Sequence, residues 1–187
     1  MILYIKNMVC SRCVMAVGQE LEKLDLEIKA IRLGEVELQT PPSENHLNTL
    51  NKRLAGLGFE ILDNQKQKQI EKIKTLLIQK VQTGDIKEHF SISDFLSKAL
   101  HKDYSYISRL FSEVEGITLE QYFILQKIEK VKELLIYGEM NTSEISYQLG
   151  YSSVAHLSSQ FKKVTGLTPS EFKKLGGHRK FLDEVKK

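Results

Sequence analysis

The sequence contains no tryptophan, three prolines and two cysteines in 187 residues. Two cysteines cannot form the multi-bridge framework of a small disulfide-rich domain. The longest uninterrupted apolar run covers residues 1–5, whereas roughly 20 residues are needed to span a bilayer. That run also lacks the basic start and long apolar stretch of a secretory signal. We therefore expect a soluble cytoplasmic protein with no membrane partner, in which closely spaced cysteines indicate metal or redox chemistry.

The chain does contain enough apolar material for a core. Hydrophobic residues make up 41% and charged residues 27% of the sequence, as is usual for globular proteins of one or two domains. Residues 1–63 carry 7 basic and 9 acidic side chains, a net charge of −2; residues 64–187 carry the remaining 20 and 15, a net charge of +5. This division indicates two modules. The basic one is a candidate for binding a polyanion, although its charge also fits an ordinary solvated surface.

Residues 1–63 show alternating strand and helix patterns. A strand at residues 2–6 precedes a helix that begins near Cys10, and alternating runs at residues 26–30 and 35–39 predict a hairpin around Gly34. Ser43 can cap a second helix, and residues 59–61 predict a last strand. The order β-α-β-β-α-β predicts an α+β, ferredoxin-like domain. One face of its sheet is covered by two helical apolar stripes, formed by Val14, Val17, Leu21 and Leu24 and by Leu47, Leu50, Leu54 and Leu57.

Met8-x-Cys10-x-x-Cys13 opens the first helix, and Gly58-Phe59 precedes the last strand. In these features residues 1–63 resemble the heavy-metal-associated domain of copper chaperones and metal-pumping ATPases, with Asn7 where that family usually has glycine. The resemblance implies that Cys10 and Cys13 bind a soft metal ion. Two sulfurs without histidine or carboxylate suit Cu(I) better than Zn(II), which takes four ligands.

The physical chemistry of the two cysteines leaves alternatives open. Thiols at a helix N-terminus are expected to have a lowered pKa, because backbone N–H groups stabilise the thiolate. The pair could instead be a redox-active dithiol, or a remnant of the scaffold that binds nothing. We expect Met8 to lie in the core rather than to act as a ligand.

Residues 64–187 change to a helical pattern, beginning with a Lys/Gln-rich helix over residues 65–82. Their most informative feature is an internal repeat at an offset of 50 residues, in which residues 111–122 and 161–172 share Phe, Val, Gly and Thr at equivalent positions. In each copy a glycine, Gly116 or Gly166, is placed to end one helix. Thr118 and Thr168 are placed to cap the next helix in a capping box.

Upstream of these segments, both copies predict a helix-turn-helix unit. The first has helices at residues 91–100 and 105–115, and the second at residues 142–149 and 154–165. A long helix over residues 119–137 joins them and spans about 28 Å at 1.5 Å per residue. Successive major-groove faces on one side of B-DNA lie roughly 34 Å apart. The joining helix could therefore hold two recognition helices against one face of a duplex, within an all-α domain of about seven helices.

The segment from Ile145 to Phe172, with Gly150-Tyr151-Ser152 and Gly166-Leu167-Thr168-Pro169, resembles the AraC/XylS family of bacterial transcription regulators. The resemblance covers about residues 65–175. His101 replaces the turn glycine of the first unit, and Ser146 replaces the usual helix-packing alanine of the second. The resemblance to this family implies that exposed residues early in the second helix of each unit contact DNA bases. These are Ser105, Tyr106, Ser108 and Arg109 in the first unit, and Val154, Ala155, Ser158 and Ser159 in the second.

Arg109 is the strongest single candidate, because a guanidinium group can pair bidentately with guanine; the alternative is a surface ion pair. Four further side chains could contact phosphates, although each alone also fits a solvated surface charge: Lys102, His156, Lys162 and Lys163. We expect a structural role for six apolar residues, namely Leu100, Ile107, Phe111, Leu149, Leu157 and Phe161.

The sequence thus predicts a metal-binding-like domain at residues 1–63, a DNA-binding domain at residues 64–175 and a basic tail at residues 176–187. The predicted function is sequence-specific regulation of transcription through double-stranded DNA, with a response to Cu(I) or another soft metal ion as a weaker hypothesis. The alternatives are a metal chaperone whose helical domain docks a protein partner, and a thiol oxidoreductase. We expect no enzyme and no small-molecule substrate, since the sequence has no phosphate-binding glycine loop, GxSxG motif or paired acid and base. Whether the chain forms a homodimer stays open.

Overall fold

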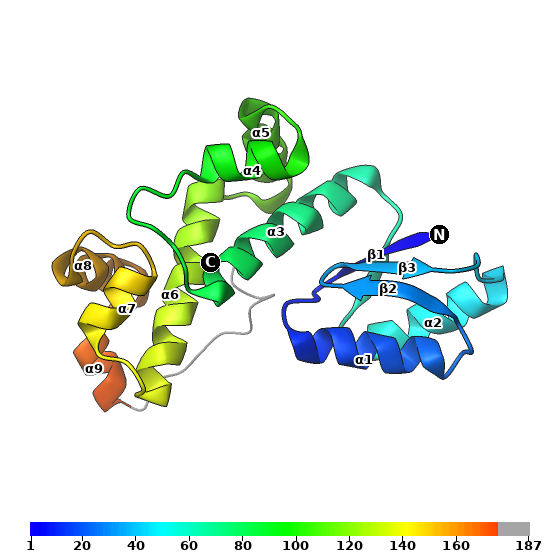
Figure 1. The fold of residues 1–187 in the computed structure, drawn as a ribbon, viewed down its shortest axis with the longest axis horizontal. Helices are drawn as coiled ribbons and strands as arrows, with labels where there is room; N and C mark the ends of the chain where they lie inside the picture. The colour runs from blue at the N-terminus through cyan, green and yellow to red at the C-terminus, as the bar shows by residue number, and fades with distance from the viewer. Residues whose placement is uncertain (176–187) are drawn as a thin grey trace. The chain divides into compact units, whose positions relative to one another are not determined.

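The computed structural model describes residues 1–175 (Figure 1). The basic tail predicted at residues 176–187 lies outside the described residues. The chain divides into two compact units, Met1–Thr75 and Leu76–Lys187. The division falls inside helix α3 (Gln65–Thr83), which therefore contributes residues to both units. Among the residues described, no helix is long and apolar enough to cross a membrane.

The first unit contains a four-stranded sheet and two helices in the order β-α-β-β-α-β that the sequence predicts. The strands lie in the order β2-β3-β1-β4, and all neighbouring strands are antiparallel. In the central strand, Leu3 lies opposite Val36 and Ile5 lies opposite Ile61. The elements are β1 (Ile2–Lys6), α1 (Ser11–Glu22), β2 (Ile28–Arg32), β3 (Glu35–Leu38), α2 (Glu44–Gly56) and β4 (Glu60–Leu62).

Side-chain alternation decides which face of this sheet is buried. In β1, Leu3 and Ile5 are buried, whereas the neighbouring Ile2 is half exposed. Successive side chains of a strand point to opposite faces, so Leu3 and Ile5 face the helices α1 and α2, which lie on one side of the sheet in Figure 1. Both helices contribute fully buried residues to this core, namely Val17 and Leu21 from α1 and Leu50 and Leu54 from α2.

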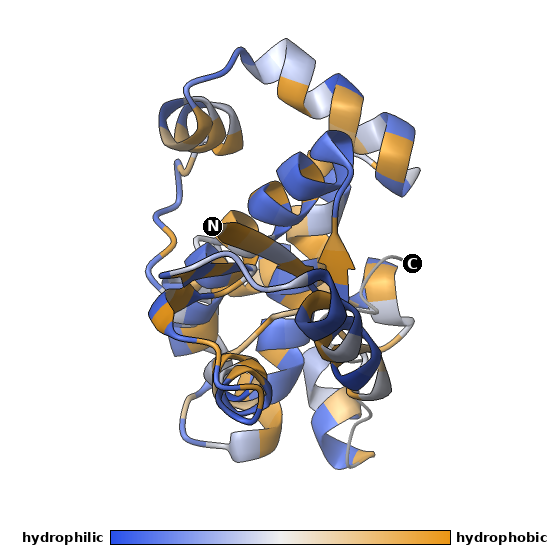
Figure 2. Cartoon of the chain, turned by 90° about the vertical axis from the view of Figure 1, so that its right-hand side faces the viewer, coloured by the Kyte–Doolittle hydropathy of each residue, from blue (hydrophilic) through white to orange (hydrophobic). Residues whose placement is uncertain are grey.

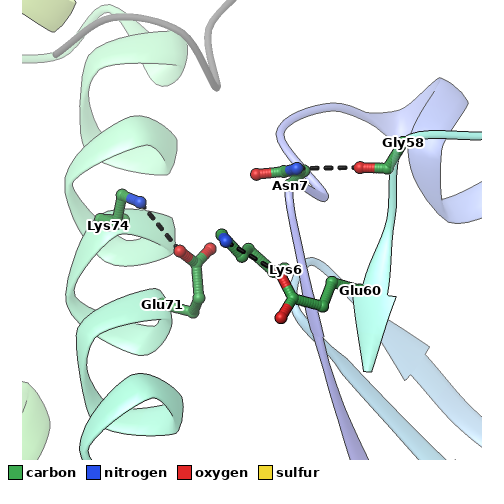
Figure 3. A network of polar contacts seen from close by, with 6 residues as sticks. All are labelled: Lys6, Asn7, Gly58, Glu60, Glu71 and Lys74. Carbon is green, nitrogen blue, oxygen red and sulfur yellow. Dashed lines mark hydrogen bonds and ion pairs between the residues drawn. The ribbon is translucent and has the colours of Figure 1, made fainter. Parts of the chain in front are cut away.

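The first turns of α3 contact the other face of the sheet. The ammonium group of Lys68 lies 5.4 Å from the centre of the Tyr4 ring, and Lys72 Nζ lies 3.8 Å from Glu35 Oε1. Figure 3 shows two neighbouring ion pairs, Lys6–Glu60 at 2.9 Å and Lys74–Glu71 at 2.8 Å. These polar contacts leave the sheet with an apolar face under α1 and α2 and a polar face toward α3.

The second unit is helical, and α6 is its central element. α6 contacts α5, α7, α8 and α9; α4 and α5 lie toward one end of it and α7 to α9 along its other half (Figure 1). Figure 2 shows hydrophobic and hydrophilic residues alternating along the helices of the chain, whereas α6 is buried on several sides, as its position at the centre of the unit requires. After α3, the helices are α4 (Ile92–Leu100), α5 (Tyr104–Glu115), α6 (Leu119–Tyr137), α7 (Thr142–Gln148), α8 (Val154–Thr165) and α9 (Pro169–Lys174).

The helix ends predicted from the repeat are confirmed. Gly116 and Gly166 end α5 and α8 in the left-handed conformation. Thr118 and Thr168 each form a capping box, with Gln121 and Glu171 respectively. These residues satisfy backbone groups that a helix terminus leaves unpaired, which explains why the observed bounds of α6 and α8 agree with those predicted.

The core of the second unit repeats along the chain as the sequence does. The Phe111 ring packs edge-on against Tyr122 at 5.3 Å between centroids, and the Phe161 ring packs in the same way against Phe172 at 5.5 Å. Five of the six predicted core residues are buried: Ile107, Phe111, Leu149, Leu157 and Phe161. The sixth, Leu100, is only half-buried, because it is the last residue of the short helix α4.

Candidate nucleic-acid interface

The first helix-turn-helix unit consists of α4, a three-residue turn and α5. His101 ends α4 in the left-handed conformation, with φ of 51°, and so takes the conformation that usually favours glycine. Asp103 then caps α5 by accepting a hydrogen bond from the Ser105 N–H at 2.8 Å. This hydrogen bonding, with that of the Ser105 hydroxyl as the larger cause, lowers the pKa of Asp103, so the turn carries a negative charge at neutral pH.

The predicted base-contacting residues of α5 differ in their surroundings. Ser105, Tyr106 and Arg109 are exposed and Ser108 is half-buried. The Ser105 hydroxyl also donates to the Asp103 carboxylate, which engages it in the cap. Lys102 Nζ lies 4.9 Å from the centre of the Tyr106 ring. Lys102 and Arg109 are the exposed cationic side chains of the described residues 102–109.

Arg109 was the sequence candidate for reading guanine, with a surface ion pair as the alternative. The side chain is exposed on α5. In the part of the chain that the structure describes, no carboxylate lies within 4 Å of its guanidinium group. The ion-pair alternative is thus not found among residues 1–175.

The second unit consists of α7, the turn at Gly150 and α8. Ser153 caps α8 by accepting a hydrogen bond from the His156 N–H at 3.0 Å, so this cap is neutral where that of α5 is anionic. Along α8, Val154, Ala155 and Ser159 are exposed, and Ser158 is half-buried. The exposed start of α8 thus presents small and apolar side chains.

The predicted phosphate contacts of α8 are exposed but not equivalent. His156 Nδ1 lies 3.0 Å from Ser152 Oγ, and its ring packs edge-on against Tyr151 at 5.3 Å between centroids. Lys162 and Lys163 lie in the last turn of α8, where positive charge also stabilises the helix C-terminus. Both side chains remain exposed and therefore accessible to a phosphate.

The turn of the second unit is packed against the segment that precedes the first unit. The Ile86 N–H donates to the Gln148 carbonyl at 3.1 Å, and Ile86 pairs with Leu149 in an isolated parallel bridge. Gly150 has φ of 68°, and a methyl group at this position would lie 2.7 Å from the Lys87 carbonyl oxygen. This contact could not be predicted from local sequence patterns, because residues 86 and 149 are separated by a complete helix-turn-helix unit.

The two cysteines lie together at the start of α1. Cys10 is the N-cap residue and Cys13 lies in the first turn, and their sulfur atoms are 3.4 Å apart. Both thiols are free and half-buried. Burial raises the pKa of Cys13 above 9.0, against a smaller opposing effect of a backbone hydrogen bond from Val9. The expected lowering of the thiol pKa is therefore wrong for Cys13, because desolvation outweighs the backbone hydrogen bonds that lower the pKa.

Asn7 holds the cysteine loop, the segment of residues 7–13 that contains Cys10 and Cys13. Asn7 has φ of 70°, and its side-chain amide donates to the Gly58 carbonyl at 2.8 Å (Figure 3). Met8 is buried in the core, as predicted. Among the described residues, no cluster of three or more His, Cys, Asp or Glu side chains could hold a metal ion. The loop therefore offers two thiols and no further protein ligand.

Comparison with known proteins gives the class of the second unit. Residues 96–175 match the family described as "Helix-turn-helix domain". The HTH-type transcriptional regulator YisR of Bacillus subtilis is 33% identical over 89 residues, which are 48% of this chain and 31% of YisR. The xylose operon regulatory protein of Escherichia coli K12 is 35% identical over 69 residues, 37% of this chain and 18% of that protein.

A solved structure shows the same fold. The C-terminal domain of AraT, a response regulator from Geobacillus stearothermophilus, superposes with a TM-score of 0.50 at 21% identity, over 60% of this chain and 89% of that domain. The C-terminal part of this chain is therefore a helix-turn-helix domain that resembles AraC-type DNA-binding domains. The chain spans about a third or less of the two curated relatives described above.

Proposed function

We propose that the protein is a DNA-binding transcription regulator of the AraC type that contacts double-stranded DNA through α5 and α8. The observation that supports this most directly is the presence of two helix-turn-helix units packed on one central helix, each with an exposed second helix. The base-contacting residues in this proposal are Ser105, Tyr106, Ser108, Arg109, Val154, Ala155, Ser158 and Ser159. The phosphate contacts are Lys102, His156, Lys162 and Lys163.

The two second helices should contribute unequally to specificity. α5 presents Arg109, whose planar donors suit a guanine edge, whereas α8 presents Val154 and Ala155 at its exposed start. Small apolar side chains can contact a thymine methyl group but donate no hydrogen bond to a base edge. We infer that α5 supplies most of the base selectivity and that α8 mainly fixes the position of the protein on the backbone.

A metal response is the second part of the proposal. We propose that unit 1 is a ferredoxin-like domain similar to heavy-metal-associated domains, with a boundary near residue 63, and that Cys10 and Cys13 bind a soft metal ion. The strand order β2-β3-β1-β4 and the 3.4 Å sulfur separation support this proposal. Two thiols fit Cu(I), while a structural Zn(II) site would need two additional ligands. When bound, the metal would supply positive charge that neutralises the two thiolates.

Selection of bound duplexes from a randomised library tests the DNA-binding proposal. The full chain should enrich a sequence whose conserved positions occupy two segments about one helical turn apart. An Arg109→Ala variant in the same selection should yield a more degenerate sequence in one of the two segments. Absence of any enriched sequence with the full chain would contradict the proposal.

The metal proposal needs a separate titration. The full chain should bind one equivalent of Cu(I) more tightly than a Cys10→Ser/Cys13→Ser variant, and the DNA selection should be repeated with and without Cu(I). Equal weak binding by both proteins would reject the metal site. Tight metal binding together with transfer to an acceptor protein, and without DNA selection, would favour a metal chaperone instead.

A further inference from the structure

Lys127 is an unusual lysine in the middle of α6. Its ammonium group donates to the Leu149 carbonyl oxygen at 3.2 Å and lies 3.9 Å from the centre of the Tyr151 ring. The Phe123 ring centre is 5.7 Å away. Within residues 1–175, no carboxylate lies within 4 Å of Lys127. This cation thus contacts aromatic rings and a backbone carbonyl, which stabilise it without neutralising its charge, rather than a carboxylate.

Both groups that Lys127 contacts belong to the turn between α7 and α8. Leu149 is the C-cap residue of α7, and the carbonyl groups at a helix C-terminus carry partial negative charge that attracts a cation. Tyr151 is the second residue after this cap and is buried. One ammonium group therefore ties the central helix to two positions of a single short turn.

Tyr151 extends this connection into α8. Its hydroxyl group donates to Gln160 Oε1 at 2.8 Å, and its ring packs edge-on against His156. His156 and Gln160 are one turn apart on α8. The ring that lies under Lys127 thus contacts the helix at two successive turns, which is sufficient to fix its direction as well as its position.

The charge of Lys127 is costly to the fold. Burial lowers the pKa of Lys127 to about 8, which means that the folded state disfavours the ammonium form. Buried charges can often be replaced by apolar residues of similar volume without loss of stability. Methionine would fill a similar space without the desolvation cost but would leave the Leu149 carbonyl without the Lys127 donor, so the two effects on stability oppose one another.

We propose that Lys127 is a positioning residue for DNA binding, whose ammonium group holds Leu149 and Tyr151 and thereby sets the orientation of α8 relative to α6. This inference rests on the proposed DNA-binding function. It assigns to the central helix a role beyond spacing the two units, because the same helix also orients the second one. Lys127 itself touches no DNA in this proposal.

The test compares Lys127→Met, Lys127→Arg and the exposed-surface control Lys98→Met in the full chain. The probe is the duplex that the unaltered chain enriches from the randomised library. Lys127→Met should bind this duplex at least about tenfold more weakly, while its urea-unfolding midpoint stays close to that of the unaltered chain, because lost contacts and relieved desolvation oppose one another. Lys127→Arg should restore binding to within about threefold, since guanidinium also stacks on an aromatic ring, and Lys98→Met should bind like the unaltered chain.

The salt dependence of binding separates positioning from direct contact. Removing a lysine that contacts a phosphate reduces the slope of log affinity against log salt by about one, as we expect for Lys163→Met. Lys127→Met should leave this slope unchanged. A reduced slope for Lys127→Met, or unchanged affinity at the enriched duplex, would overturn the proposal.

Two further outcomes are distinguishable from these. If the unaltered chain enriches no duplex, the proposed DNA-binding function fails and the role of Lys127 fails with it. If Lys127→Met does not fold, Tyr151→Phe carries the test, because it keeps the ring under Lys127 but removes the hydrogen bond to Gln160. Tyr151→Phe should weaken binding by a smaller factor at an unchanged salt slope, and unchanged affinity for this variant would reject the proposed connection.

Discussion

The side-chain amide of Asn7 donates a hydrogen bond to the backbone carbonyl of Gly58 at 2.8 Å, across the two ends of neighbouring strands β1 and β4. Asn7 has a positive φ, a conformation that asparagine adopts more readily than most non-glycine residues. At position 7 this chain thus combines a left-handed backbone conformation with a side-chain hydrogen bond. Cys10 lies three residues further along the cysteine loop, which is anchored by this contact.

Substitution of Asn7 should separate the two effects. Asn7→Gly loses only the hydrogen bond and should cost about 1 kcal/mol. Asn7→Ala loses the bond and also forces alanine into the left-handed region, which should cost about 2–3 kcal/mol in total. Hydrogen exchange of the β1 and β4 amides under urea measures both values. Equal destabilisation by the two variants would mean that the backbone conformation at position 7 carries no strain.

Gly150 and Gly116 form a matched pair for a second prediction. Both have positive φ, but only Gly150 lies against other backbone atoms, those of residues 86 and 87. Gly116→Ala should cost about 1–2 kcal/mol for the left-handed conformation. Gly150→Ala adds a steric clash and should cost about 3 kcal/mol or more. Urea unfolding followed by the helical circular dichroism signal gives the comparison, and a smaller cost at position 150 would refute the packing described here.

Arg109 should determine base preference in the segment that α5 contacts. Arg109→Ala should lose about 1–3 kcal/mol of binding free energy on the enriched duplex and relax the preference at one position. Arg109→Lys keeps the charge but loses the bidentate geometry, so it should retain general affinity and still lose the preference. Binding of variant duplexes at fixed salt measures this, and an unchanged profile for both variants would show that α5 faces away from the bases.

The pKa of Lys127 leads to a prediction about pH. This pKa lies at about 8 in the folded chain, against 10.5 as the ordinary value, so the unfolded state binds more protons between these two values. Stability should therefore rise with pH across this interval, by at most about 3 kcal/mol. The increase should be absent from Lys127→Met, and the difference between the two urea-unfolding curves isolates it. A fall in this difference with rising pH would show that the Tyr151 ring and the Leu149 carbonyl raise the pKa of Lys127 by more than burial lowers it.

The raised pKa of Cys13 predicts that metal binding and alkylation at this thiol in the first unit depend on pH. At neutral pH the thiol is protonated, so binding of a soft metal must release a proton and should tighten as pH rises toward 9. Alkylation of Cys13 by iodoacetamide should accelerate over the same range, because the thiolate is the nucleophile. Mass spectrometry of a Cys10→Ser variant follows Cys13 alone. Rapid alkylation that is independent of pH would indicate a stabilised thiolate instead.

Local signals in the sequence were sufficient for the helices and strands but not for every contact between them. The bounds of α6 follow from Thr118 and Gly138, which cap it at either end, and Thr168 marks the start of α9 in the same way as Thr118 marks that of α6. The contact of Lys127 with Tyr151 was not predictable, because a lysine on a helix ordinarily extends into solvent and its aromatic partner lies 24 residues further along the chain. Its position followed only from the packing of α7 against α6.

The candidate site was predictable to a similar extent. The resemblance to the AraC/XylS family implied that Ser105, Tyr106 and Arg109 are exposed on α5, and the structure has all three exposed. The sequence pattern could not show that the Ser105 hydroxyl is engaged by Asp103, nor that burial raises the pKa of Cys13. Both depend on the desolvation and hydrogen bonding of individual atoms, which residue periodicity does not encode.

The packing of Gly150 against residues 86 and 87 has a consequence for how the helical domain can be divided. The turn of the second helix-turn-helix unit packs against residues 86 and 87, which precede the first unit in the sequence. We therefore expect that the second unit alone does not form its native turn. A C-terminal fragment that begins between the two repeats would lack residues 86 and 87, against which the Gly150 turn packs. Although the two halves resemble one another in sequence, this contact joins the turn of the second half to a segment that precedes the first, so we expect the two halves to fold together.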